Sequence, residues 1–151
     1  PIILQLQRKF PNNYSFYFMH CVALLELRRL EEAEAIAAQI ETNIRLGTPP
    51  YMPQLQPRYY QLLGRIHFNR GEYGRAESYF HKAIQDKSFY NMRTIARSLL
   101  YLGMIHEIRQ ERKYAEDYYR RVLKTEGADG AAQIEARQYL KTPYRMNENS
   151  R

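Results

Sequence analysis

The chain of 151 residues is 44% hydrophobic and 26% charged, and it carries a net charge of +7. Its length fits one domain, and its balance suits a folded, mostly helical protein better than a disordered chain. No apolar run reaches the roughly 20 residues of a transmembrane helix, and the N-terminus lacks the apolar core of a signal peptide. A single cysteine, Cys21, excludes an internal disulfide and a cysteine-rich zinc site.

Apolar residues at spacings of three and four predict amphipathic helices along almost the whole chain, and no segment alternates long enough to predict a strand. Asn12 or Asn13 is expected to cap a helix, Gly47 to Pro53 to end one, and Asp129 or Gly130 to lie near a helix start. The predicted helices are Ile2–Phe10, Tyr14–Glu26, Glu31–Leu46, Arg58–Asn69, Tyr73–Lys87, Met92–Gln110, Lys113–Thr125 and Ala131–Lys141.

Small and bulky apolar residues recur at the same offsets in three segments. Gly64 is followed by such residues after 12, 16 and 19 positions, and the same holds from Cys21 and from Gly103. Two antiparallel helices approach closely only where side chains are small, so these positions predict the crossings of helix hairpins that stack on one another. The three sets are Cys21, Ala33, Ala37 and Ile40; Gly64, Ala76, Phe80 and Ala83; and Gly103, Ala115, Tyr119 and Val122.

These segments resemble the tetratricopeptide repeat (TPR) family. The resemblance implies an all-α, right-handed α-solenoid of antiparallel helix pairs. The repeat step departs from the family, being 43 and then 39 residues against about 34. The tight-turn glycine is present only as Gly71, with Arg28 and Gln110 at the matching places. The motifs are Tyr17-x-x-His20-Cys21-x-x-Leu24 with Ala33-x-x-x-Ala37, Tyr60-x-x-Leu63-Gly64-x-x-His67 with Ala76-x-x-x-Phe80, and Leu99-x-x-Leu102-Gly103-x-x-His106 with Ala115-x-x-x-Tyr119.

The predicted organisation is a single TPR-like domain over residues 1–141, followed by a flexible tail over 142–151. Because the chain lacks an initiator Met, we expect it to be a piece of a longer protein. The compartment stays open, with the cytoplasm favoured. The domain is predicted to contain a remnant helix over 1–10, repeats over 14–46, 58–87 and 92–125, and a capping helix over 131–141.

No motif predicts catalysis, a cofactor or a metal site. A nucleophile elbow, a glycine-rich phosphate loop and a CxxC pair are all missing. His106-Glu107 cannot start a zinc-protease motif, because Gln110 stands where the second histidine is needed. His67 and His106 occupy a place where the family has a packing aromatic, so packing is favoured over metal binding. We therefore predict a non-enzymatic chain.

The resemblance implies that the first helix of each hairpin lines a concave groove for an extended peptide or a partner helix. The groove is expected to be apolar at its N-terminal end and basic in its middle, which fits an acidic and apolar partner. The clamp that some TPR proteins use for C-terminal carboxylates needs Lys and Asn where Phe18 and Val22 stand, so that specificity is not predicted. The candidate groove residues are Phe18, Met19, Val22, Arg58, Gln61, Arg65, Asn69, Arg97, Tyr101 and Met104.

Several alternatives stay open. The groove residues can simply be solvated or be covered by other repeats of a parent chain, and the chain can be a regulatory or sensor segment of a larger enzyme or transcription factor. The charge excess lies in residues 58–151, with eighteen basic and eleven acidic groups. Nucleic acid is nevertheless disfavoured as a partner, because basic side chains alternate with acidic ones, as at Arg75 between Glu72 and Glu77. Membrane-surface binding is also disfavoured, and the exposed terminal repeat is a route to self-association.

Overall fold

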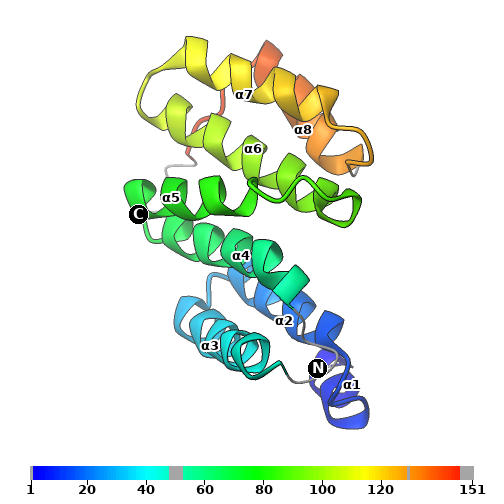
Figure 1. Ribbon diagram of the computed structural model, residues 1–151. Helices are drawn as coiled ribbons and strands as arrows, with labels where there is room; N and C mark the ends of the chain where they lie inside the picture. The colour runs from blue at the N-terminus through cyan, green and yellow to red at the C-terminus, as the bar shows by residue number, and fades with distance from the viewer. Residues whose placement is uncertain (1, 48–52, 129, 147–151) are drawn as a thin grey trace. The chain divides into compact units, whose positions relative to one another are not determined.

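In the computed structural model, every regular element over the described residues 2–47, 53–128 and 130–146 is a helix (Figure 1). This confirms the predicted all-α class and agrees with a helical repeat, while the handedness stays a prediction. None of the described helices has the length and apolar character to cross a bilayer. The elements are α1 (Ile2–Lys9), α2 (Tyr14–Glu26), α3 (Leu30–Leu46), η1 (Pro53–Leu55), α4 (Gln56–Asn69), α5 (Tyr73–Ala83), η2 (Phe89–Asn91), α6 (Met92–Ile108), α7 (Arg112–Lys124) and α8 (Gly130–Lys141).

Most predicted helix ends agree with the observed ones to within about two residues. Asn13 caps α2, as predicted, because its Oδ1 accepts a hydrogen bond from the backbone N–H of Ser15 at 3.1 Å. The predicted break after α3 begins at Gly47, which has φ +62°. Its continuation over 48–52, Asp129 and the tail residues 147–151 lie outside the described residues. Helix α8 begins at Gly130, one of the two residues predicted to lie near a helix start.

Helix α5 ends at Ala83 and not at Lys87 as the spacing predicted. The side chain of Asn91 explains why the helix ends earlier. Its Nδ2 donates to the backbone carbonyls of Ala83 at 3.0 Å and of Asp86 at 2.8 Å, and the residue is almost completely buried. The carbonyl of Ala83, the last residue of α5, therefore accepts from a side-chain donor in place of a further helical turn.

The three hairpin turns share one backbone geometry. Arg28, Gly71 and Gln110 all have left-handed φ values, of 57°, 76° and 62°. In each turn the N–H of this residue donates to the carbonyl three positions back, and the following N–H donates to the carbonyl five positions back, which is the Schellman arrangement. The longer bonds join Arg29 to Leu24 (2.9 Å), Glu72 to His67 (2.9 Å) and Glu111 to His106 (2.8 Å).

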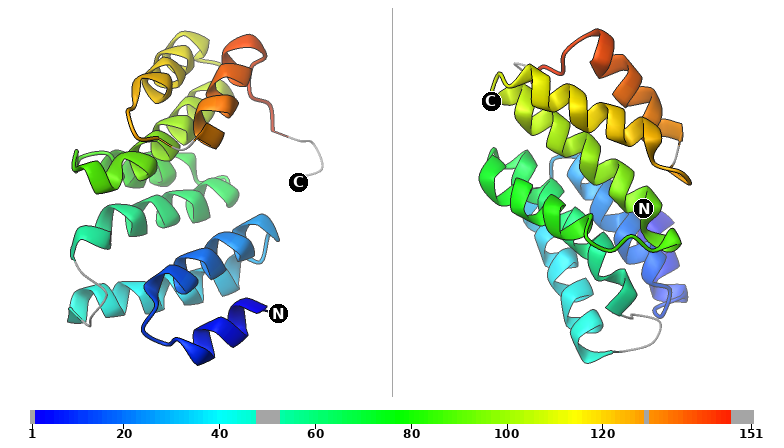
Figure 2. Two further views of the ribbon diagram at one scale, coloured as in Figure 1. Left: turned by 90° about the vertical axis from the view of Figure 1, so that its right-hand side faces the viewer. Right: turned by 45° about the horizontal axis from the view of Figure 1, so that its top comes forward.

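The chain forms two compact units, Pro1–Tyr79 and Phe80–Arg151, and the boundary between them falls inside α5. In the first unit, α2 packs against α3, both contact α4, and α1 lies against α2. In the second unit, α6 packs against α7, and α8 contacts both (Figure 2). The single repeat domain over 1–141 stays a prediction.

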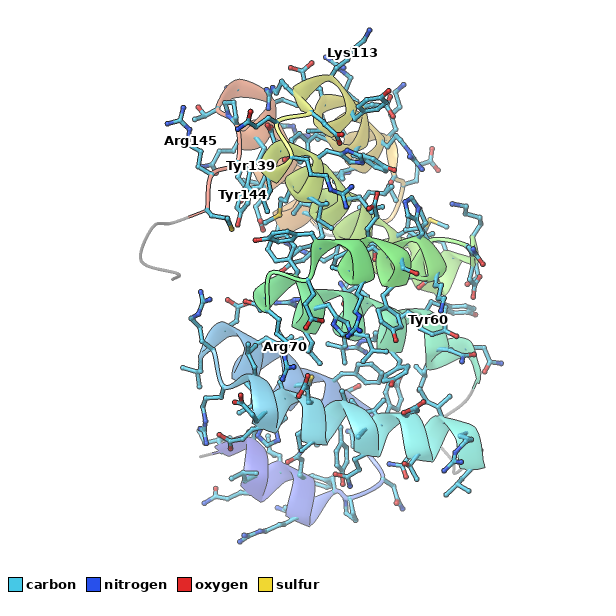
Figure 3. The ribbon with its side chains drawn as sticks, turned by 90° about the vertical axis from the view of Figure 1, so that its left-hand side faces the viewer. Tyr60, Arg70, Lys113, Tyr139, Tyr144 and Arg145 are labelled. Carbon is cyan, nitrogen blue, oxygen red and sulfur yellow. The ribbon has the colours of Figure 1, made fainter. Side chains whose placement is uncertain are left out.

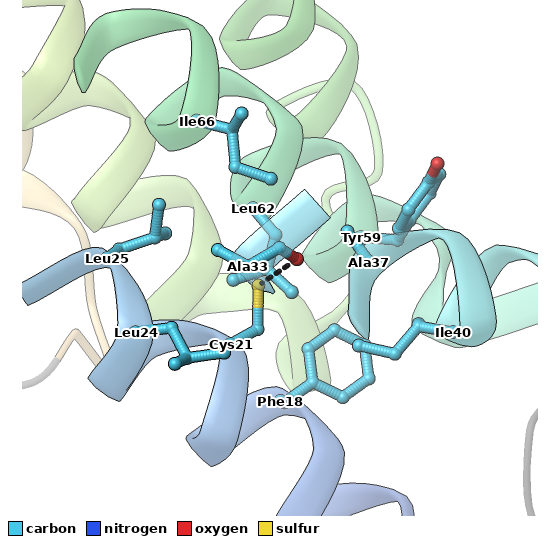
Figure 4. Packing of buried hydrophobic residues seen from close by; sticks show 10 residues of the cluster. All are labelled: Phe18, Cys21, Leu24, Leu25, Ala33, Ala37, Ile40, Tyr59, Leu62 and Ile66. Carbon is cyan, nitrogen blue, oxygen red and sulfur yellow. Dashed lines mark hydrogen bonds between the residues drawn. The ribbon is translucent and has the colours of Figure 1, made fainter. Parts of the chain in front are cut away.

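The core of the first unit contains the predicted landmarks of α2 and α3. Cys21 is fully buried, and its thiol donates to the carbonyl of Ala33 at 3.4 Å (Figure 4). Burial raises the pKa of the Cys21 thiol to about 12, so the group is a neutral core residue. The buried cluster consists of Phe18, Cys21, Leu24, Leu25, Ala33, Ala37, Ile40, Tyr59, Leu62 and Ile66.

In the second unit, Gly103 marks the place where α6 and α7 cross. A Cβ atom at Gly103 would lie 2.7 Å from Cδ1 and 3.0 Å from Cζ of Tyr119, so no side chain fits there. Tyr119, Ala115 and Val122 are fully buried around this contact, as the offsets from Gly103 predicted. Burial raises the pKa of the Tyr119 hydroxyl, because an ionised phenol would be poorly solvated there.

Candidate functional site

The candidate groove residues lie on the first helices of the hairpins. Those on α2 and α4 belong to the first unit, and those on α6 belong to the second. Their use as one continuous groove stays a prediction. Within each unit, the structure shows which of these side chains are accessible and which already have partners.

On α2, the three candidate residues have different surroundings. Phe18 is fully buried and belongs to the core cluster of the first unit. Met19 is 53% exposed, and Val22 is half-buried. Met19 is therefore the most accessible of the three candidate residues on α2.

Arg58 of α4 lies over the face of the Phe18 ring, with 4.3 Å between the guanidinium carbon and the ring centroid. This cation–π contact brings a charge close to the core. Burial lowers the pKa of the Arg58 guanidinium, and nearby Tyr14 acts in the opposite direction. Gln61, one turn further along α4, is almost completely buried.

Arg65 and Asn69, further along α4, are engaged within the first unit. Nη2 of Arg65 contacts Oε1 of Glu26 at 2.6 Å, and only 11% of the Arg65 side chain is exposed. Asn69 donates through Nδ2 to the Arg65 carbonyl at 2.9 Å. The predicted basic centre of the groove is therefore partly neutralised by an acid of α2.

The α6 candidates also have neighbours inside their unit. Nη1 of Arg97 contacts Oε1 of Glu135 on α8 at 2.7 Å. The Tyr101 ring stacks on the Phe80 ring, with 5.0 Å between centroids and 12° between planes. Met104 is buried. The ion pair of Arg97 therefore joins α6 to α8 within the second unit.

Aromatic side chains also join the end of α8 to its surroundings. The Tyr139 ring lies 5.6 Å from the Tyr119 ring and 5.4 Å from the Tyr144 ring, between centroids. Tyr139 and Tyr144 lie together in Figure 3. Burial raises the pKa of the Tyr139 hydroxyl. These tyrosines are part of the packing of the second unit.

The two equivalent histidines are packing residues, as predicted. His67 stacks on Tyr79 with 5.4 Å between centroids, and His106 stacks on Tyr118 with 5.3 Å. Each histidine also contacts, through Nδ1, the glutamate five positions on, at 2.6 Å for His67 and 2.5 Å for His106. No group of three or more potential metal ligands occurs in the described part of the chain.

Residues 58–87 match the family model of the tetratricopeptide repeat. This segment contains the second of the three motifs that carried the resemblance, so the match supports it. No curated protein and no solved structure matches the chain.

The matched TPR segment contains four of the candidate residues. Gln61 and Arg65 lie beside the small residue Gly64 of the motif, and Arg58 and Asn69 lie one to two turns away on the same helix. TPR segments are typical of protein–protein interaction modules.

Sequence reasoning missed the acidic partners and one pocket. Glu26 lies 39 residues before Arg65. Periodicity shows which residues share a face of one helix, but it does not show which residues of different helices lie side by side. The pocket, of about 530 Å³, lies at the turn between α1 and α2. It is lined by Lys9, Phe10, Pro11, Asn12, Asn13 and Tyr14.

Proposed function

We propose that this chain is a non-catalytic protein-interaction module that holds a partner peptide or helix along the first helices of its hairpins, α2, α4 and α6. The TPR match carries the proposal, because stacked TPR hairpins typically present extended surfaces to protein partners. The shared turn geometry at Arg28, Gly71 and Gln110 supports it, since it extends the same hairpin beyond the matched segment.

The proposed partner has both apolar and acidic residues. Met19 supplies an accessible apolar contact, and Arg58 supplies a positive charge on the neighbouring helix. Methionine adapts its shape to different apolar side chains, and arginine holds carboxylates through two parallel hydrogen bonds. The proposed binding residues are Phe18, Met19, Val22, Arg58, Gln61, Arg65, Asn69, Arg97, Tyr101 and Met104.

Charge reversal at Arg65 or Arg97 is a poor first test. A glutamate at either place would face Glu26 or Glu135 and would break an ion pair within the unit. Met19→Glu avoids this problem because the side chain is exposed. Proteins captured from a lysate by the wild-type chain would be identified and purified, and their affinities measured by calorimetry. We expect Met19→Glu to weaken binding about tenfold, the size of an interface hot-spot effect.

The matched control is Leu46→Glu. Leu46 is 68% exposed and lies at the end of α3, a second helix of a hairpin that is not part of the proposed surface, so its replacement should leave the affinity unchanged. Equal effects of the two variants would refute the proposed surface. Loss of the captured material on nuclease treatment, with a steep fall of affinity in salt, would instead identify nucleic acid as the ligand.

A further inference from the structure

Arg58 is one of four half-buried arginines in the described part of the chain, and it differs from the other three. A charge removed from water is costly unless it is paired, so such arginines normally hold carboxylates. No described residue forms an ion pair or a hydrogen bond with Arg58, which lies over the Phe18 ring and interacts electrostatically with nearby Tyr14. The paired arginines are Arg65 with Glu26, Arg97 with Glu135, and Arg112 with Glu107 and Glu116.

No acid of the first unit remains as a hidden partner for Arg58. The residues of this unit outside the described ranges are Pro1 and the segment 48–52, and none of them carries a carboxylate side chain. Every acidic side chain of the unit is therefore described, and none is paired with Arg58. They are Glu26, Glu31, Glu32, Glu34, Glu41, Glu72 and Glu77.

The surroundings of Arg58 favour a carboxylate as the missing partner. The Phe18 ring below the guanidinium is fully buried and therefore fixed in place. A guanidinium that lies over an aromatic face keeps five N–H donors at its edge, and a carboxylate accepts two of them in parallel. Arg58 keeps part of its surface exposed, so a ligand can reach it.

A second contact lies close by. The Tyr14 ring meets the Phe18 ring edge-on, with 6.4 Å between centroids. Tyr14 also lines the pocket of about 530 Å³ at the turn between α1 and α2, together with Phe10 and Pro11. A pocket of this size is large enough for an apolar side chain next to the carboxylate.

We propose that Arg58 binds a carboxylate group of the partner peptide and that the Phe18 ring forms the floor of this site. The inference rests on the proposed function, because the carboxylate belongs to the bound peptide. Arg65 and Arg97 are already neutralised within their units, so they position α2 and α8 and do not supply this contact. The carboxylate comes from an Asp or Glu side chain or from a C-terminus, since both have the same chemistry.

The test is an NMR titration of the ¹⁵N-labelled protein, following the arginine Nε–Hε resonances. Arg58→Lys and Arg45→Lys spectra assign the two resonances to be compared. The probes are acetyl-Leu-Glu-Leu-amide, with a side-chain carboxylate, and acetyl-Leu-Ala-Leu with a free C-terminus. Acetyl-Leu-Gln-Leu-amide, without a carboxylate, and inorganic phosphate are the controls.

We expect at least one carboxylate peptide to shift the Arg58 resonance to saturation, with a Kd about tenfold or more below that at the exposed Arg45, because a half-buried charge interacts more strongly. The peptide that binds identifies the source of the carboxylate. Arg58→Gln should abolish the binding, whereas Arg45→Gln should retain it.

Three results would overturn the inference: no saturable shift with either carboxylate peptide, equal affinities at Arg58 and Arg45, or saturation by phosphate alone. The proposed function is tested separately. If Arg58→Gln binds the captured partner as tightly as the wild type, the carboxylate site is wrong while the interaction module stands.

Discussion

Gln110 closes the turn between α6 and α7 in a left-handed conformation, with φ 62°. This conformation costs an L-residue about 1–2 kcal/mol, because Cβ approaches the backbone too closely. Glycine avoids that contact but loses about 0.5–1 kcal/mol through the greater freedom of its unfolded chain. The Gln110 side chain is exposed and forms no hydrogen bond with any residue that the structure describes. We therefore expect Gln110→Gly to stabilise the protein by about 0.5–1 kcal/mol.

The free energy of unfolding in urea, followed by circular dichroism, measures this effect. In a chain of this size, about 1 kcal/mol corresponds to roughly 2–4 °C in Tm. The matched control is Gln138→Gly, at an exposed place inside α8, which should destabilise the protein by about 1 kcal/mol. If Gln110→Gly destabilises the protein as much as Gln138→Gly does, the argument from backbone strain is wrong.

Three other predictions test the packing and the ionised groups. Gly103→Ala should destabilise the second unit by about 1–3 kcal/mol in urea unfolding, because the new Cβ overlaps the buried Tyr119 ring. The Cys21 thiol should react with an aromatic disulfide reagent only after unfolding. Since its pKa is raised to about 12 from an ordinary 9.0, the native state should also lose stability as the pH rises from 9 towards 12. The pKa of the Glu72 carboxyl is lowered by its hydrogen bond with His67, so the carboxylate stabilises the fold above its ordinary pKa of 4.5. The stability difference between wild type and Glu72→Gln should therefore shrink as the pH falls through and below that value.

Each of these predictions has a control. Gly74→Ala, also within a helix but with open space around the new Cβ, should be neutral or stabilising. If Gly74→Ala destabilises the protein as much as Gly103→Ala does, the argument from the helix crossing is wrong. Cys21→Ala should show no reaction in either state, and rapid labelling of the native wild type would contradict the buried position. For Glu72→Gln, a stability difference that is the same at pH 3 and pH 7 would exclude the hydrogen-bonded carboxylate.

The hairpin crossings could be predicted because small residues leave a regular trace in the sequence. Gly103 and Ala115 are separated by the same offset as Cys21 and Ala33, and all four are buried in the structure. The turns could be predicted less fully. The expected glycine is present only at position 71. Gln110 adopts the same left-handed backbone conformation because the Schellman hydrogen bonds and the packed helices hold it there.

The predicted end of α5 was wrong because a contact from outside the helix ends it. Apolar spacing continues beyond Ala83, so periodicity predicted a longer helix. The side chain of Asn91, eight residues further along the chain, donates a hydrogen bond to the carbonyl of Ala83, and the helix ends there. Hydrogen bonds of this kind depend on how the next segment folds back, and helix spacing does not include them.

The sequence by itself determined the helical class, the hairpin crossings and the faces on which Arg58, Arg65 and Arg97 lie. These properties depend on periodicity and side-chain size, which act over neighbouring turns. Only the tertiary structure decided which arginines are already paired. The acids that neutralise Arg65 and Arg97 lie 39 and 38 residues away along the chain. A charge is buried, paired or open to a partner according to the helices that pack beside it, so the distinction of Arg58 appears only when α2 and α4 are in contact.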